Sequence, residues 1–167
     1  MKTLVIHPFD LTTGFLEDIY IDKGWTIVDW NPSHAGLKHI IKEHDRIIML
    51  GHGTEDGLLG YGRFIINSEL VYLLREKICI YIWCNADIFV KKYSLKGFYT
   101  GMIISECNEA EMFYVYATNK EIYESNVLFS KAIKESIDDI DMLSKVKSIY
   151  IGHSEVINYN KYNMYQI

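Results

Sequence analysis

Short runs of apolar residues recur along this 167-residue chain, and segments with helical spacing or helix-capping residues lie between them. Two of the runs, at residues 46–50 and 78–83, are apolar almost throughout. Strands of this composition are buried on both faces, which is typical of parallel sheets covered by helices on each side. The alternation of strand and helix signals therefore predicts an α/β fold with a mostly parallel sheet.

The expected elements follow from these runs. We expect strands at residues 3–8, 25–30, 46–50, 78–83 and 101–105, with a last strand or extended edge at 148–152. Helices are expected at residues 15–21, 33–44, 69–76, 88–93, 109–116 and 125–137. We interpret the glycine-rich segment as a long flexible loop and the tyrosine-rich tail as a packed extension (51–62 and 158–165). Together they predict a three-layer sandwich with a sheet of five to six strands. No Pro-, Gly- or Ser-rich linker interrupts the chain, so residues 1–167 are expected to form a single α/β domain.

Composition narrows the classes of partner. Hydrophobic residues make up 49% of the chain and charged residues 23%, which is enough for a sizeable core. The net charge is −5, whereas nucleic-acid-binding proteins usually carry a basic patch, so no nucleic-acid partner is expected. The longest apolar stretch, residues 78–90, is interrupted by Asn85 and Asp87, so no membrane span is expected either.

Cysteine and histidine spacing give no reason to expect a metal or a cofactor. The three cysteines are an odd number without metal-type spacing, which is typical of a reduced, cytoplasmic protein. His34, His39 and His44 are five residues apart, so they point to different sides of a helix and do not form a zinc site. The GxGxxG and GxxxxGK[ST] patterns of nucleotide-binding loops are absent.

Two chemically useful side chains follow the two most apolar runs. His52 follows the first run within Gly51-His52-Gly53, and Cys84 follows the second. In open α/β sheets, functional groups gather just beyond the carboxyl ends of parallel strands. A histidine and a cysteine at two neighbouring ends would face the same crevice, as a thiol nucleophile and its base require. The simpler interpretation is that Cys84 is a small buried side chain and that His52 bonds a loop carbonyl.

This order of motifs resembles the caspase-like cysteine peptidases, a superfamily of caspases, metacaspases, legumains, gingipains and separases, together with the related CHAT domains. The resemblance covers roughly residues 1–115: a strand ending in His-Gly, a further strand–helix unit, and a strand ending in Cys. It implies a caspase-like fold, a peptide or protein substrate, Cys84 as nucleophile and His52 as general base. It also implies that the backbone N–H of Gly53, with that of Cys84, forms the oxyanion hole. Trp83 departs from the small residue that many members carry before the nucleophile.

Three further polar residues are candidates for substrate contact. Asn85 and Asp87 lie one and three residues after Cys84, and their simpler role is to cap the next helix, whereas a catalytic Asp87 would orient His52. Glu106 is expected to follow the fifth strand, where the resemblance implies a pocket for the residue preceding the scissile bond. The carboxylate of Glu106 or Glu109 would pair there with a basic side chain, although the simpler role of Glu109 is to begin a helix.

Two alternatives stay open at this stage. A non-catalytic protein-binding module on the caspase-like scaffold would use the acidic segment 54–57 and the tyrosine-rich tail, and an exposed last strand would permit a homodimer. A flavodoxin-like nucleoside glycosidase or transferase would use Asp10 and Glu106 as its working carboxylates. Asp10 also belongs to a polar turn with Thr12 and Thr13 that would suit an anion. Fold alone does not decide among these functions.

Overall fold

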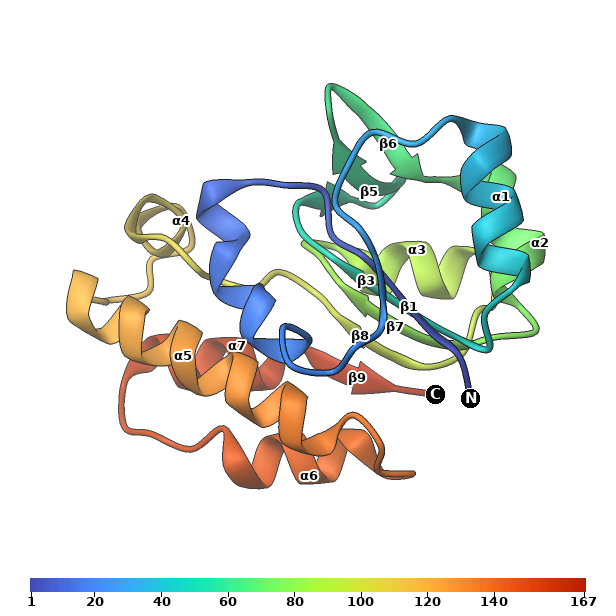
Figure 1. Cartoon of the computed structure of the whole chain (residues 1–167). Coiled ribbons are helices and arrows are strands. Elements are labelled where there is room, and N and C mark those ends of the chain that lie inside the picture. The colour runs from blue at the N-terminus through green and yellow to red at the C-terminus, as the bar shows by residue number, and fades with distance from the viewer.

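At the centre of the computed structural model, which describes residues 1–167, lies a six-stranded sheet in the order β2-β1-β3-β7-β8-β9 (Figure 1). The strands are β1 (Thr3–Ile6), β2 (Thr26–Val28), β3 (Arg46–Leu50), β7 (Ile78–Ile82), β8 (Phe98–Thr100) and β9 (Met164–Gln166). All neighbours are parallel except β9, which runs antiparallel to β8. The prediction of a three-layer α/β sandwich with a mostly parallel sheet of five to six strands is confirmed.

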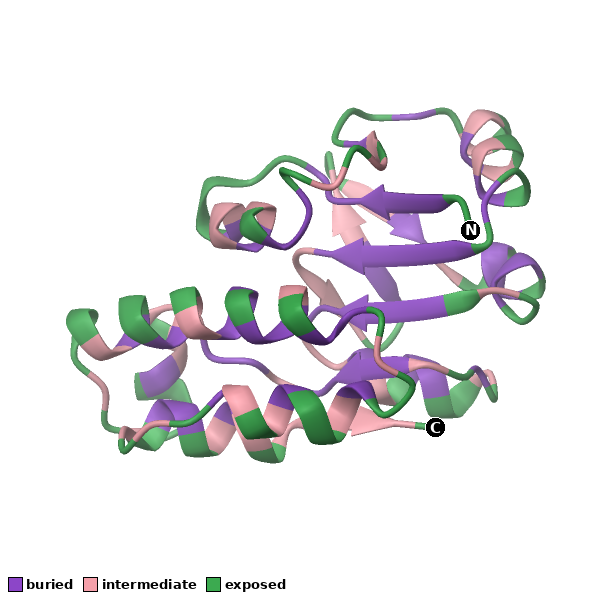
Figure 2. Ribbon diagram, turned by 60° about the horizontal axis from the view of Figure 1, so that its bottom comes forward, coloured by how far each residue is buried: buried purple, intermediate pink, exposed green.

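Side chains that alternate along the strands build a separate core on each face of the sheet. Leu4 and Ile6 of β1 pack with one helical layer, whereas Val5 packs with the other. The first layer contains α1 (His34–Lys42), α2 (Val71–Leu74) and α3 (Ala86–Lys92). The second contains η1 (Leu11–Ile19), α5 (Asn119–Ser136), α6 (Met142–Ile149) and α7 (Glu155–Tyr162). Strands β1, β3, β7 and β8 are accordingly almost entirely buried, while the helices show their exposed faces to solvent (Figure 2).

Local capping explains where several helices begin. The Ser33 side chain accepts a hydrogen bond from the Gly36 N–H at the start of α1, as its sequence position predicts. Thr118 and Glu121 form a reciprocal capping box at the start of α5. Asp10 caps η1, which is a 3₁₀-helix and begins four residues before the helix expected at residues 15–21. No helix in the structure combines the length and the apolar character needed to cross a membrane.

The segment expected to be a flexible loop is an ordered three-stranded antiparallel sheet. It consists of β4 (Gly53–Thr54), β5 (Gly57–Gly60) and β6 (Arg63–Ile66), followed by the short 3₁₀ turn η2 (Ser68–Leu70). Buried Leu58 and Ile66 join the first core and hold the sheet in place. At Gly57 the backbone has φ +142°, and a Cβ there would overlap the Ile66 carbonyl, so the glycine serves close strand pairing rather than flexibility.

The fifth strand lies earlier than expected. β8 ends at Thr100, and residues 101–105 leave the sheet as an irregular segment. The backbone N–H and C=O of Ile104 bond the side chain of Asn160, at 2.7 and 2.9 Å, instead of a neighbouring strand. An apolar stretch can therefore be buried without being a strand when a side-chain amide satisfies its backbone.

The last strand also lies elsewhere than expected. Residues 148–152 finish α6 and continue into a loop, so the expected strand or extended edge at that position is wrong. The tyrosine-rich tail instead forms α7 and β9, in which Met164 is buried and pairs with Thr100. α4 (Cys107–Met112) precedes this region and forms a small third core with Ile104 and α5.

Candidate functional site

His52 and Cys84 lie at the same edge of the sheet. They follow β3 and β7, which are adjacent and parallel, with Leu50 in register with Ile82. Both residues line one narrow pocket. Apolar side chains, among them Phe15 and Phe129 from the second helical layer, form much of its wall. The structure thus brings a thiol and an imidazole to a common, largely apolar cavity.

The Cys84 thiol is protonated at neutral pH. Cys84 is half-buried, and its sulfur donates to the Ile103 carbonyl oxygen at 3.8 Å rather than to His52. Burial raises the pKa of the Cys84 thiol to about 11, and the negative charge of Glu109 acts in the same direction. Because the thiolate is the nucleophilic form, reaction at this sulfur needs a base that takes the proton.

His52 is held by the first turn of η1. Its side chain is 38% exposed, and Nε2 lies 2.6 Å from Thr12 Oγ1 and 3.7 Å from Asp10 Oδ1. These residues follow β1, the other neighbour of β3, so three adjacent strand ends contribute to the site. The sequence pattern predicts an anion-binding turn for Asp10 and Thr12 and does not pair them with His52. Their position after the strand beside β3 is the signal that could have found the contact.

Gly53 lies in β4 directly beneath the indole of Trp83. A Cβ at this position would overlap Trp83 Cδ1 and would lie 2.6 Å from the Gly57 carbonyl oxygen. The Trp83 indole N–H donates to the Thr54 carbonyl oxygen at 3.0 Å, which fixes the ring over the small sheet. A glycine after His52 is therefore required by packing, whatever role its backbone N–H has in chemistry.

The residues after Cys84 turn the chain sharply into α3. Asn85 occupies the position before the helix with φ +67°, and its side chain makes no capping hydrogen bond. Asparagine tolerates this left-handed conformation better than most residues, so it serves the turn itself. Asp87 in the first turn of α3 forms an ion pair with Lys91 at 3.0 Å. The expectation that Asn85 or Asp87 caps the helix through a side-chain hydrogen bond is wrong for Asn85.

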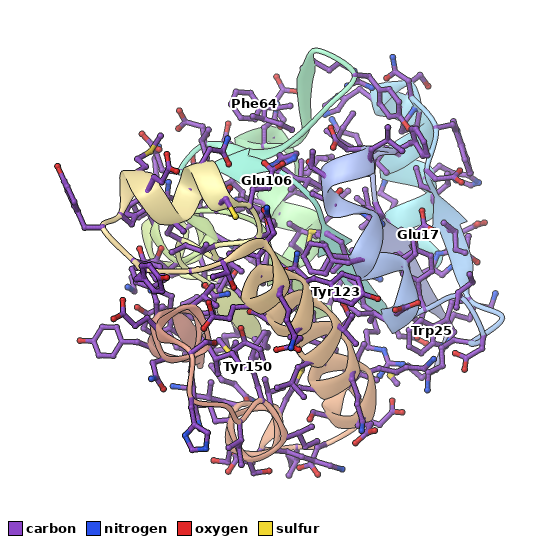
Figure 3. All side chains as sticks on the ribbon, turned by 90° about the vertical axis from the view of Figure 1, so that its left-hand side faces the viewer. Glu17, Trp25, Phe64, Glu106, Tyr123 and Tyr150 are labelled. Carbon is purple, nitrogen blue, oxygen red and sulfur yellow. The ribbon has the colours of Figure 1, made fainter.

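None of the three substrate-contact candidates, Asn85, Asp87 and Glu106, lines the pocket that holds His52 and Cys84. Glu106 occupies the position before the first residue of α4 (Figure 3), and its backbone N–H donates to the Glu109 carboxylate. Ser105 and Glu109 line the pocket instead.

The Glu109 carboxylate is fixed by hydrogen bonds at its Oε2 atom. That oxygen accepts from the Ser105 N–H at 2.7 Å, from the Glu106 N–H at 3.1 Å and from the Ser105 hydroxyl at 3.2 Å. The expectation that Glu109 begins a helix is confirmed, because it lies in the first turn of α4.

A second cavity opens on the other side of His52. It is wider than the first pocket, and Phe9, Asp10, Tyr61 and Arg63 belong to its lining. The Tyr61 hydroxyl donates to the Asp29 carbonyl oxygen, which holds the β5–β6 turn against the loop after β2. His52 therefore stands in the wall between a narrow apolar pocket and a more polar groove. No cluster of three or more His, Cys, Asp or Glu side chains has the geometry of a metal site.

Comparison with known proteins assigns this chain to no family. No family model matches the sequence, and no curated protein matches it. Among solved structures, the chain is similar to the apo-structure of D-lactate dehydrogenase from Escherichia coli, with a TM-score of 0.34 and 12% sequence identity. The similarity covers 95% of this chain and 58% of that chain, so this chain spans little more than half the length of the dehydrogenase. A TM-score this low defines neither a family nor a function.

Proposed function

We propose that the protein is a cysteine hydrolase that cleaves a peptide bond, with Cys84 as nucleophile and His52 as general base. The observation that carries the proposal is that both residues follow adjacent parallel strands and line one pocket. The resemblance of the Gly51-His52-Gly53 and Cys84 motifs to caspase-like peptidases supplies the reaction class. The substrate is accordingly a peptide or a protein.

The reaction has an acylation half and a deacylation half, and His52 transfers one proton in each. In the first half, the Cys84 sulfur bonds the substrate carbonyl carbon while the thiol proton moves to the imidazole. The backbone N–H groups of Gly53 and Cys84 would stabilise the oxyanion. The C–N bond then breaks, and the same proton passes to the leaving amine. In the second half, His52 takes a proton from water while the water oxygen bonds the thioester carbon. The C–S bond then breaks, the proton passes from His52 to the Cys84 sulfur to restore the thiol, and the acyl group leaves as a carboxylic acid.

The raised pKa of the Cys84 thiol indicates whether its proton is transferred before or during the attack on the substrate. A preformed thiolate–imidazolium pair would need a thiol whose pKa is lowered, whereas burial raises the pKa of this thiol to about 11. The proton therefore moves to His52 as the sulfur attacks, and not before substrate binds. Glu109, fixed by Ser105 and Glu106 in the pocket wall, would favour a substrate with a basic side chain on the acyl side of the bond.

The test is covalent labelling with a peptidyl acyloxymethyl ketone that carries lysine or arginine next to the reactive group. Mass spectrometry of the full chain should place one adduct on Cys84, and Cys84→Ser and His52→Ala should each abolish both labelling and hydrolysis of the matching peptide. Cys107→Ser is the matched control, because Cys107 lies outside the pocket and bonds Asn119. Hydrolysis that survives Cys84→Ser, or an adduct on Cys107 instead of Cys84, would refute the assignment.

The two alternatives are separated by the same experiment. A protein-binding module would leave Cys84 unlabelled and the peptide intact. A nucleoside glycosidase or transferase would need Asp10 and Glu106 together, but Asp10 contacts His52 whereas Glu106 precedes α4 outside the pocket. All three cysteines are free, which suits our further proposal of a cytoplasmic location.

A further inference from the structure

Asp10, Thr12 and His52 form a continuous hydrogen-bonded row beside the pocket. Thr12 Oγ1 lies 2.6 Å from Asp10 Oδ1 and 2.6 Å from His52 Nε2. The Thr12 backbone N–H donates to the same Asp10 oxygen at 2.8 Å. Because Asp10 caps η1 and Thr12 lies in its first turn, the row ties the start of this helix to the residue that follows β3.

The number of protons on these three side chains determines which atom donates in each hydrogen bond. Hydrogen bonds from the Thr12 hydroxyl and backbone N–H hold the pKa of the Asp10 carboxyl below its usual range. At neutral pH Asp10 is therefore a carboxylate, which only accepts hydrogen bonds. A hydroxyl oxygen approaches a carboxylate oxygen to 2.6 Å only when a proton lies between them. The Thr12 hydroxyl therefore donates its single proton to Asp10. Toward His52, the Thr12 oxygen can only accept a hydrogen bond, which Nε2 must donate.

We propose that Thr12 and Asp10 are positioning residues that hold neutral His52 with its proton on Nε2, leaving Nδ1 as the proton acceptor. The opposite tautomer would place a lone pair of Nε2 against a Thr12 oxygen that has no proton to give. Nδ1 makes no hydrogen bond within the protein and is not sealed from solvent. It is therefore the ring nitrogen that is free to receive a proton.

The assignment of the His52 tautomer does not depend on the proposed function. Its consequence for the reaction does rest on that function. The proton that leaves the Cys84 sulfur would go to Nδ1, and the ring would become an imidazolium. Its Nε2–H would still be bonded to Thr12, with the Asp10 carboxylate 3.7 Å away as counter-charge. When the C–N bond breaks, the Nδ1 proton goes to the leaving amine, and the neutral ring returns with its original tautomer.

The tautomer is measured by ¹⁵N NMR of the histidine side chains in the labelled full-length protein, at a pH where His52 is neutral. His52 should show a protonated, pyrrole-type Nε2 and an unprotonated, pyridine-type Nδ1. Thr12→Val, which keeps the shape but removes the hydroxyl, should give a mixture of tautomers with averaged shifts, and Thr12→Ser should restore the original spectrum. An Nδ1–H tautomer in the unchanged protein, or no change in Thr12→Val, would overturn the proposal.

The control is His7, whose Nδ1 bonds the Tyr20 hydroxyl at 2.9 Å. Tyr20→Phe should move the His7 resonances and leave those of His52 in place. In the hydrolysis assay, Thr12→Val should lower kcat by up to about 100-fold with little change in KM, and Thr12→Ser should recover the rate. A change in KM alone would mean a structural role and refute positioning. If the unchanged protein hydrolyses nothing, the proposed function fails, and the spectrum still decides the role of Thr12.

Discussion

His7 follows β1 directly and is buried. Both ring nitrogens have partners, because Nδ1 bonds the Tyr20 hydroxyl and Nε2 bonds Thr13 Oγ1 at 3.1 Å. Burial lowers the pKa of His7 from 6.5 to about 4, although the nearby negative charge of Asp10 acts in the opposite direction. A neutral His7 thus fixes Tyr20 and Thr13, the buried side of the same helix whose first turn holds His52.

This buried histidine should make stability depend on pH. Between about pH 6.5 and pH 4 the unfolded chain binds a proton at His7 and the folded chain does not, so stability falls as the pH decreases through this window. The full loss is about 3 kcal/mol. Urea unfolding of the unchanged protein and of His7→Gln, which cannot titrate, measures it. The free energy of unfolding should fall more steeply toward low pH in the unchanged protein, and parallel curves would contradict the assignment.

At the scale of elements, the small β4–β5–β6 sheet couples the site to the first core. Trp83 precedes Cys84, and its ring lies edge-on to Phe89 of α3 at 5.6 Å between centroids. The same indole covers Gly53 and donates to Thr54, so one side chain joins β7, α3 and β4. The position of the Cys84 turn therefore depends on how closely β4 approaches this ring.

Gly53→Ala tests that dependence. The added methyl group would overlap the indole and the Gly57 carbonyl, so we expect a loss of about 1–3 kcal/mol in the free energy of unfolding. The displaced Trp83 should also change the rate at which iodoacetamide alkylates Cys84. Gly14→Ala in η1 is the matched control, because a Cβ at Gly14 would have no neighbouring atom within 4 Å, and it should be neutral or slightly stabilising. Equal stability of the two variants would exclude the packing argument.

The same elements show which parts of the fold could be predicted from the sequence and which could not. β3 and β7 were predicted correctly because their long apolar runs are buried on both faces, and their order alone brings His52 and Cys84 to one edge. β8 and β9 were missed because each has three residues and each is stabilised by its pairing with the other, across a long sequence separation. The contact between Thr12 and His52 depends on the direction in which η1 leaves β1, which no local pattern encodes.

At the scale of the whole molecule, the sheet separates two cores, and polar contacts at the start of β3 help to connect the layers. Arg46 makes these contacts, opposite the edge that holds His52. Its side chain is 4% exposed and donates to Thr3 Oγ1 at 3.1 Å, to the Ile137 carbonyl oxygen at 3.2 Å and to Asp138 Oδ1 at 2.6 Å. The guanidinium also lies 4.8 Å from the ring centroid of Trp25. Arg46 thereby fastens the end of α5, and with it the second helical layer, to the central strands.

Asp138→Ala removes the counter-charge of a buried guanidinium, so it should cost more than the loss of an ordinary surface ion pair. We expect a loss of about 1.5–3 kcal/mol in the free energy of unfolding, because the remaining partners of Arg46 are uncharged. Glu135→Ala, which breaks an exposed pair with Lys131 on the same helix, should cost no more than about 0.5 kcal/mol.

A double-mutant cycle shows whether the loss of stability in Asp138→Ala comes from the lost interaction with Arg46. In an Arg46→Met background, where an apolar side chain replaces the buried charge, Asp138→Ala should have little further effect, and the difference is the coupling energy. Alkylation of Cys84 should be unchanged in Asp138→Ala, because the pair lies at the opposite end of β3 from the pocket. Equal costs of Asp138→Ala in both backgrounds would mean that the carboxylate acts on the turn after α5 and not through Arg46.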